Sequence, residues 1–422
     1  MLELNKIKQN FQIIINDLKK RGIDATSNLN NILDLDTQRI ANQQRLDAIL
    51  AEGNKIAQQI GLMARENKIS QIKLLKERAS EIKLESKDLM DNGKEIGQNI
   101  RNILVQIANT PHNSVPDGKN SSDNVIEFEW GDEKQDSNLL PHWELAEKYN
   151  IIDFKKGAEI AGSGFPLYKG LGAKLQRGLI NFFLDYNTQA GYEEYIPPYF
   201  VNEQSAFNTG QLPDKEGMMY HIQNDNLYVI PTAEVPITNI FNNTKVKLSD
   251  LPIKCTAYSP CFRREAGSYG KEVRGLNRLH QFDKVEIVQI CEPEQSYTTL
   301  DLMVQHVSKL LKMLELKFRI VKLCGGDLGF TAALTYDFEV YAPGQKKWLE
   351  VSSVSNFETY QANRLNLKYT DVEKKNVLCH TLNGSSLALP RIVVAILEQH
   401  QHANGVSMPK VLLEYLKFDQ IM

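Results

Sequence analysis

The sequence predicts an α+β protein in two parts: an N-terminal antiparallel two-helix coiled-coil arm, and a domain built on an antiparallel β-sheet with helices around it. Two patterns carry this prediction. The first 110 residues contain no proline and repeat apolar residues at helical spacing, whereas later segments alternate apolar and polar residues. A stretch with two prolines and a turn, residues 109–118, separates the patterns. We therefore place the domains at residues 1–110 and 111–422.

Heptad spacing predicts the coiled coil. One apolar seam has members seven residues apart, and a companion seam carries small residues in its middle. The pattern lapses at residues 65–68, which predicts the tip of a hairpin. Each leg of roughly 38 residues would be about 55 Å long, which suits an arm better than a domain core. The first seam is Leu75, Ile82, Leu89, Ile96 and Ile103, and the second is Ile72, Ala79, Ser86, Gly93, Ile100 and Ile107.

The distal half of this arm is mildly basic. Residues 27–108 contain 12 Lys or Arg against 11 Asp or Glu, but residues 65–87 contain seven against four. Such an excess is enough to follow an RNA backbone. The pattern by itself equally suits a spacer or a dimerisation device.

Composition bounds the class of protein. The chain has 422 residues, 42% of them hydrophobic and 24% charged, as is typical of a soluble globular protein. A net charge of −3 excludes a basic field over the whole molecule. The five cysteines are scattered without a CxxC pair, which predicts a reducing compartment and argues against a disulfide framework or a zinc site. With no secretory signal pattern and no long apolar run, we expect a soluble cytoplasmic protein.

A hairpin rich in arginine is the strongest candidate for a functional element. The segment from Cys261 to Glu286 reads as two antiparallel strands joined by a long loop. Residues two apart share a face of a strand, so Arg263 with Glu265, and Phe282 with Glu286, can face one ligand. Positioned arginines, an aromatic ring and a carboxylate suit a nucleotide. The alternative is a salt-bridged surface hairpin.

This hairpin resembles a known motif. Residues 262–286, FRREAGSYGKEVRGLNRLHQFDKVE, resemble motif 2 of the class II aminoacyl-tRNA synthetases. They resemble in particular the version of this motif in seryl-tRNA synthetases of the bacterial type. The resemblance covers essentially the whole chain. It includes the arm, the PHNSVPDG linker, Thr-Ala-Glu at residues 232–234, a motif 1-like segment at residues 171–198, and Glu-Val-Ser-Ser at residues 350–353.

The resemblance implies an activity and its partners. The enzyme would activate L-serine with ATP to seryl-adenylate and pyrophosphate, and then pass serine to the terminal ribose of tRNA(Ser). It would also charge the selenocysteine tRNA in a cell that makes one. A homodimer is implied, in which the arm reaches across to the variable arm of the tRNA. The sequence offers no defensible Ser-His-Asp or Cys-His arrangement, which agrees with catalysis by positioning.

The resemblance also assigns roles to residues. Arg263 would hold the α-phosphate and the seryl carboxylate, Glu265 the adenine amino group, and Arg391 the γ-phosphate, at the start of a helix. Phe282 would stack on the adenine. The ATP-binding set is completed by Arg264, Arg278, Glu350, Val351, Ser352 and Ser353.

Two further groups concern the metal and serine. Glu350 and Ser353 would ligate the Mg²⁺ that accompanies ATP, and we expect no zinc. Residues three apart face opposite sides of an ideal strand, so the strand must end or bulge near Ser352 for both to bind one ion. The expected serine site contains Thr232, Ala233, Glu234 and Arg263, with Glu286 for the ammonium group and Asn383 or Ser385 for the hydroxyl.

Three departures and two alternatives accompany this assignment. Gly164 stands where the family usually has arginine, and Ser386 and Pro390 where many class II sequences have glycine. A catalytically inactive, RNA-binding paralogue would be expected to lack Arg263, Arg391 or the arm. An enzyme that charges a carrier protein would be expected to lack the arm. All three features are present.

Overall fold

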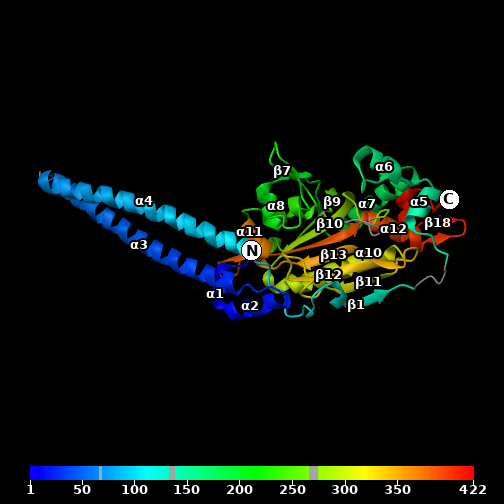
Figure 1. Cartoon of the computed structure of the whole chain (residues 1–422), viewed down its shortest axis with the longest axis horizontal. Coiled ribbons are helices and arrows are strands. Elements are labelled where there is room, and N and C mark those ends of the chain that lie inside the picture. Colours follow the sequence, from blue (N-terminus) through cyan, green and yellow to red (C-terminus); the bar gives the residue numbers. More distant parts are fainter. Residues whose placement is uncertain (66–68, 133–137, 266–273) are drawn as a thin grey trace. The chain divides into compact units, whose positions relative to one another are not determined.

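The computed structural model describes residues 1–65, 69–132, 138–265 and 274–422, which fall into two compact units (Figure 1). Residues 2–16 and 23–108 form one unit, and Met1 with residues 17–22 and 109–422 forms the other. The tip of the predicted arm, residues 66–68, and the loop of the predicted hairpin, residues 266–273, lie outside the described residues.

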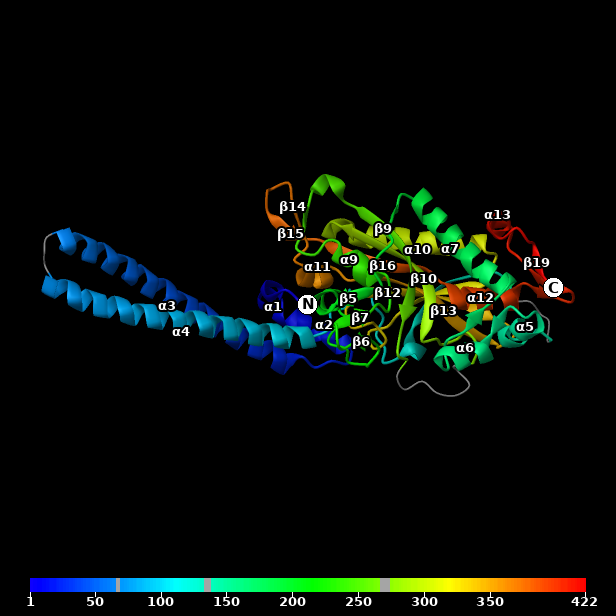
Figure 2. The ribbon, with the colours of Figure 1, turned by 90° about the horizontal axis from the view of Figure 1, so that it is seen from above.

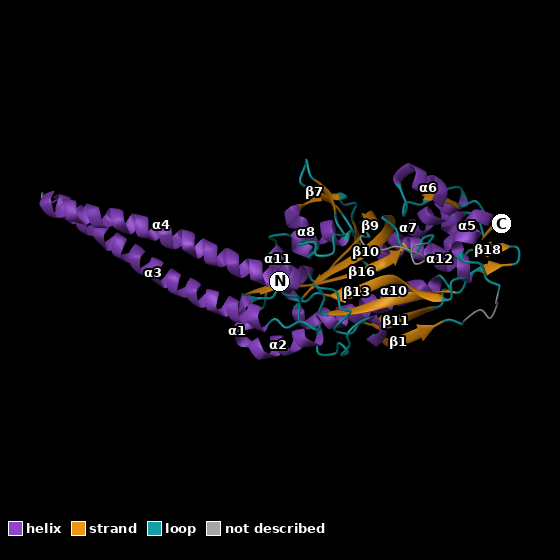
Figure 3. Ribbon diagram, in the orientation of Figure 1, coloured by secondary structure: helices purple, strands orange, loops and turns teal. Residues whose placement is uncertain are grey.

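Two long helices form the first unit. Helices α3 (Thr26–Arg65) and α4 (Ile69–Gln106) run side by side as the predicted arm (Figures 1 and 3), and the short α1 (Leu4–Gln9) and α2 (Phe11–Lys20) precede them. The predicted seams of α4 are confirmed, because each of their members is buried or half-buried, whereas Leu74, Leu84 and Met90 on other faces are exposed.

The face of α3 that contacts α4 is more polar than the spacing of its apolar residues predicts. Ile40, which fitted the apolar pattern, is exposed, and Asn42 donates from Nδ2 to the Leu89 carbonyl over 2.8 Å instead. A Cβ on Gly93 would lie 3.0 Å from that amide nitrogen, so a small residue in α4 makes room for Asn42. Nearer the N-terminal end of α3, Asp36 is buried and accepts hydrogen bonds from Lys8 and Arg39. Burial opposes ionisation there, but these bonds lower the pKa of Asp36.

An eight-stranded sheet forms the centre of the second unit. All neighbouring strands are antiparallel except β4 and β9, so the predicted antiparallel sheet is confirmed. The strand order is β1 (Val125–Trp130), β11 (Phe318–Lys322), β12 (Leu334–Ala342), β13 (Lys347–Asn356), β16 (His380–Ala388), β10 (Gln281–Cys291), β9 (Ile253–Phe262) and β4 (Glu193–Glu194).

The sheet has an apolar face and a polar face. Side chains alternate along β10, so Val285 and Ile287 join the main core while Lys284 and Glu286 point the other way. Helices α7 (Leu171–Gln189), α10 (Ser296–Met313) and α12 (Leu389–Gln399) supply the apolar residues that pack against the first face (Figure 2). Buried polar side chains collect on the second face.

Two irregularities in register shape the polar face. Glu350 pairs with Glu339 and Ser352 pairs with Phe338, so Val351 is an extra residue in β13. Lys284 pairs with Ala388 but Glu286 pairs with Ser385, which places an extra residue in β16. Each bulge reverses the alternation along its strand. The predicted bulge near Ser352 is therefore confirmed.

The segment WELAEKYNIIDF, residues 143–154, reads as one helix in the sequence, but the helix is shorter in the structure. Helix α5 (His142–Lys148) ends before Asn150, which takes a positive φ of 53°, and β2 (Ile152–Asp153) follows. The remaining elements lie around the sheet: β3 (Leu167–Tyr168), α6 (Phe154–Ala161), β5 (Phe200–Asn202), α8 (Glu203–Thr209), β6 (Tyr220–Ile222), β7 (Leu227–Val229), α9 (Glu234–Asn239), β8 (Lys245–Val246), α11 (Thr359–Leu365), β14 (Lys368–Thr370), β15 (Asn376–Leu378), β17 (Gln401–His402), β18 (Gly405–Ser407), α13 (Leu413–Leu416) and β19 (Gln420–Ile421).

Among the helices of the described residues, none is long and apolar enough to cross a membrane.

Candidate active site

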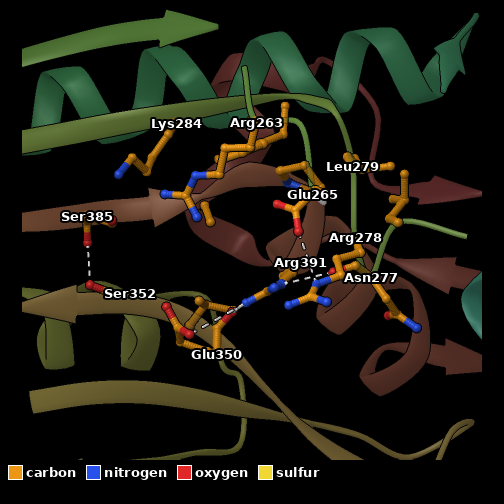
Figure 4. A pocket seen from close by; sticks show the side chains of 15 residues that line it. Arg263, Glu265, Asn277, Arg278, Leu279, Lys284, Glu350, Ser352, Ser385 and Arg391 are labelled. Carbon is orange, nitrogen blue, oxygen red and sulfur yellow. Dashed lines mark hydrogen bonds and ion pairs between the residues drawn. The ribbon is translucent and has the colours of Figure 1, made fainter. Parts of the chain in front are cut away.

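Two cavities adjoin on the polar face of the sheet. They share Arg263, Lys284, Glu350 and Ser385, which therefore mark the junction between the two. Figure 4 shows the first cavity, into which side chains from β10, β13, β16, α12 and the chain after β9 converge. Its lining is Arg263, Glu265, Leu276, Asn277, Arg278, Leu279, Phe282, Lys284, Glu350, Val351, Ser352, Ser385, Ala388, Pro390 and Arg391.

Three arginines of the first cavity are held by named partners. The Arg278 Nε lies 3.1 Å from the Glu265 Oε2, and the Arg263 guanidinium lies 5.2 Å from the centre of the Phe282 ring. Arg391 donates from Nη1 to the Glu350 carbonyl over 2.6 Å, and it sits in the first turn of α12. These arginines form a positively charged surface suited to phosphate groups, beside an aromatic face.

The second cavity, of about 460 Å³, is larger and more acidic. Thr232 donates from Oγ1 to Glu286 Oε2 over 2.9 Å, and Lys284 makes an ion pair with the same oxygen. Gln361 donates from Nε2 to Glu234 Oε1 over 2.7 Å. Of the predicted serine-binding residues, the cavity is lined by Thr232, Glu234, Arg263, Glu286, Asn383 and Ser385.

Burial governs the protonation of the two carboxyl groups. Burial raises the pKa of Glu234 to about 7, and the negative charge of Glu286 adds to the rise. Burial also raises the pKa of Glu286, while the Lys284 ammonium and the Thr232 hydroxyl oppose that rise. A further cation in the cavity would therefore favour the ionised form of both carboxyl groups.

The bulge at Val351 brings the two predicted metal ligands onto one face. Glu350 and Ser353 both line the second cavity, and Asp337 pairs with Ser353 across the sheet. Asp337 Oδ1 is buried without a hydrogen-bond partner, and burial together with the charge of Glu350 raises the pKa of Asp337 well above its ordinary value. A divalent cation held by oxygen ligands would satisfy this site, so these residues fit Mg²⁺.

Two predicted site residues and one departure lie elsewhere. Ala233 is fully buried in a small apolar cluster, and Arg264, whose backbone N–H donates to the Met218 carbonyl, lines neither cavity as far as the described residues extend. Gly164 has a φ of +84°, and a Cβ there would lie 2.5 Å from the His280 ring. Any larger residue at position 164 would need that ring to move.

Sequence reasoning missed several lining residues. Lys284 lies between Phe282 and Glu286 on the same face of β10, so the two-residue period could have identified it. Apart from Arg278, which was predicted, the lining residues in segments 276–279 and 210–219 carried no such signal. Their places depend on packing between segments far apart in the chain.

Comparison with known proteins identifies the family. Residues 1–111 match the model of the seryl-tRNA synthetase N-terminal domain, and residues 219–400 match that of the class II tRNA synthetase core domain (G, H, P, S and T). A serine–tRNA ligase from Salinibacter ruber is 43% identical over 100% of this chain and 99% of its own, and one from Methylacidiphilum infernorum is 44% identical over 99% of each. The chain belongs to the seryl-tRNA synthetase family.

A solved structure agrees with this membership. A seryl-tRNA synthetase from Pyrococcus horikoshii, crystallised with ATP, superposes with a TM-score of 0.93 at 34% identity, covering 100% of this chain and 99% of the other. The predicted family, class II fold and enzyme class are confirmed. The alternative of an inactive paralogue has no support among the matched members of the seryl-tRNA synthetase family, whose names are those of ligases.

The raised pKa of Glu234 predicts a pH dependence of stability. Between its ordinary value of 4.5 and about 7, the folded chain holds a proton on Glu234 that the unfolded chain has lost. Stability from this group is therefore fully present below pH 4.5 and falls as pH rises to about 7, by up to about 3 kcal/mol. Urea unfolding from about pH 5 to about pH 8 should show this fall relative to Glu234→Gln. Parallel profiles for the two proteins would contradict it.

Proposed function

We propose that this chain activates L-serine with ATP and transfers the seryl group to the 3′-terminal ribose of tRNA(Ser), and of the selenocysteine tRNA where one is present. The observation that carries the proposal is the junction of the two cavities. Arg263 and Lys284, both cationic, line the arginine-rich cavity and the acidic cavity alike. A nucleotide in the first and an amino acid in the second would meet there.

The geometry suits the first chemical step. A serine carboxylate oxygen attacks the α-phosphorus of ATP, a new P–O bond forms, and the bond to the bridging oxygen breaks so that pyrophosphate leaves. Both reactants are anionic, so the step requires screening and alignment more than a nucleophilic side chain. Arg263 at the junction supplies positive charge to both, and Arg391, which lies beside Glu350 in the first cavity, supplies more (Figure 4).

The acidic cavity suits a small hydroxy amino acid. The ammonium group of serine would pair with Glu286, close to Thr232, and Glu234 would add a second negative charge once it is ionised. The hydroxyl would hydrogen-bond Asn383 or Ser385. Alanine would leave those polar groups unpaired and would be rejected for that reason, whereas threonine would be rejected by lack of space.

Glu350 and Ser353 would hold Mg²⁺ with ATP, and Asp337 lies beside them. When bound, the ion would neutralise phosphate charge. The absence of a zinc requirement remains a prediction.

The arm, residues 1–110, would bind the tRNA. Lys73, Lys76, Lys83 and Lys87 are exposed on α4 within its basic part. Phosphate contacts of this kind would add affinity without selecting a base.

We further propose a cytoplasmic homodimer. The resemblance of α7 and the following residues to motif 1 supports a dimer contact at this segment, and Ile196, next to two prolines, is 87% exposed. The five cysteines are all free thiols, as a reducing cytoplasm would keep them. Sedimentation of the purified chain at twice the monomer mass would support the dimer, and sedimentation as a monomer would refute it.

Amino-acid-dependent exchange of labelled pyrophosphate into ATP tests the activation step. We expect exchange with serine, and weaker exchange with alanine by a factor on the order of 10⁴. Arg263→Ala should lower serine-dependent exchange by at least about 100-fold. Arg101→Ala, an exposed arginine on α4, is the control and should leave it unchanged. Folded protein that binds tRNA but exchanges with no amino acid would favour the inactive paralogue.

Two adjacent serines test the metal assignment. Ser353→Ala should raise the Mg²⁺ concentration needed for half-maximal exchange about tenfold, because it removes an oxygen that the bulge directs at the ion. Ser352 donates from Oγ to the Ser385 carbonyl over 2.6 Å, so Ser352→Ala should lower the melting temperature and leave the Mg²⁺ requirement unchanged. The opposite pattern would place the ion elsewhere.

Charge reversal on the arm tests its role. Lys73→Glu combined with Lys76→Glu should raise the KM for tRNA about tenfold and leave serine-dependent exchange intact. Lys94→Glu, nearer the C-terminal end of α4, is the control. A tRNA KM that stays within twofold of wild type would show that this part of the arm does not bind tRNA.

A further inference from the structure

A buried pair behind the first cavity has no role in the chemistry described above. His142 begins α5 and Glu398 lies in the last turn of α12, and both side chains are 0% exposed. Neither residue lines the two cavities formed by the described residues. Burying a carboxyl group and an imidazole without a function or a full set of partners is unfavourable, so their contacts are informative.

His142 connects α12 to the segment that precedes β10, the return strand of the arginine-rich hairpin. Its Nδ1 lies 2.9 Å from Glu398 Oε1, and the backbone N–H of Leu276 donates to its Nε2 over 2.9 Å. Because Nε2 accepts a hydrogen bond, the ring proton must lie on Nδ1 and point to Glu398. Gly275 fits tightly against this ring, since a Cβ there would lie 2.1 Å from Nε2.

Glu398 connects the same network to the turn between β12 and β13. Its Oε2 accepts from the backbone N–H of Gly344 over 2.9 Å, and its Oε1 accepts from Gln345 Nε2 over 2.7 Å. Gln345 in turn accepts from Asn277 Nδ2 over 2.8 Å. The carboxylate therefore holds two separate stretches of chain.

The segment held by this network forms one wall of the first cavity. Leu276, Asn277, Arg278 and Leu279 all line it. The Asn277 carbonyl also accepts from Arg391 Nε over 3.3 Å, so the network reaches a second phosphate-facing arginine (Figure 4). Two arginines of the cavity thus depend on where residues 276–279 lie.

We propose that His142 and Glu398 are positioning residues for ATP, which hold residues 275–279 so that Arg278 and Arg391 face the nucleotide. This inference rests on the proposed use of the first cavity for ATP. The two residues touch neither substrate nor metal. They act through the Leu276 N–H, the Gln345 side chain and the Asn277 carbonyl.

The surroundings keep His142 neutral, as this role requires. Burial lowers the pKa of His142, the positive charges of Lys347 and Arg274 lower it further, and Glu398 opposes them. Trp143 packs edge-on against the ring and Arg274 lies 4.6 Å from the Trp143 ring centre. A protonated imidazole would carry a hydrogen on Nε2 and could no longer accept from Leu276.

Substitutions that keep only one of the two hydrogen bonds of the His142 ring test the proposal. The amide of Asn can replace Nδ1 and reach Glu398, whereas the longer Gln can place an acceptor near the Leu276 N–H. We expect His142→Asn to raise both the KM for ATP in exchange and the Kd for ATP measured by calorimetry about tenfold, with the KM for serine within about twofold of wild type. His142→Gln should recover most of the ATP affinity. Glu398→Gln, a milder change, should raise the ATP Kd at least about threefold.

The neighbouring Gln399 provides the matched control. It lies on the same helix and donates to the carbonyls of Lys317 and Tyr341, with no hydrogen bond to residues 275–279. Gln399→Ala should lower the melting temperature without changing the ATP Kd. If Glu398→Gln and His142→Asn bind ATP like wild type, or if ATP and serine constants rise together, the positioning role is wrong. Wild-type protein that binds ATP without serine-dependent exchange would refute the proposed function and leave this inference standing.

Discussion

The alternation of side chains along the central strands is the constraint on which the site depends. A strand presents every second residue to each face, so a sheet packed on one side by α7, α10 and α12 must place the intervening side chains on the other. On β10, Val285 and Ile287 therefore pack in the core, whereas Lys284 and Glu286 line the second cavity. The same strand thus stabilises the fold and builds the site.

Bulges adapt this period to chemistry. If β13 paired regularly, without the bulge at Val351, Glu350 and Ser353 would lie on opposite faces, and the oxygen ligands suited to a cation would be separated by the sheet. In β16 the second bulge lets Ser385 and Ala388 line the same cavity. Both bulges are local departures from regular strand pairing, and both occur in strands whose residues line the cavities.

Buried charge is the second feature of the site. Glu234 and Glu286 are nearly fully buried, a cost that Lys284, Gln361 and Thr232 offset in part. A cationic ligand would favour the ionised form of these carboxyl groups, while the arginines of the adjoining cavity favour an anionic ligand. A zwitterionic amino acid satisfies both at the junction. The same logic of burial extends to His142 and Glu398, whose partners lie on the wall of the nucleotide cavity.

Much of this architecture could be predicted from the sequence because its signals are local. The heptads of α4, the alternation of β12 and the arginines of the hairpin all follow from spacing within short stretches. The exposure of Ile40 could not be predicted, because it is Asn42 that contacts α4 at that point, where Gly93 of α4 makes room for it. Arg278 was predicted, but its neighbours Leu276, Asn277 and Leu279, and also His142, were missed, because their roles arise from contacts between segments far apart in the chain.

We propose that one continuous chamber, formed by the two adjoining cavities, holds a nucleotide and serine on either side of Arg263. A structure of the chain with a non-hydrolysable seryl-adenylate analogue would test this proposal. We expect the adenine against Phe282, the phosphate-like linker beside Arg263, and the seryl ammonium group within hydrogen-bond distance of Glu286. An analogue bound outside the chamber, or with its seryl group directed away from Glu286, would contradict it.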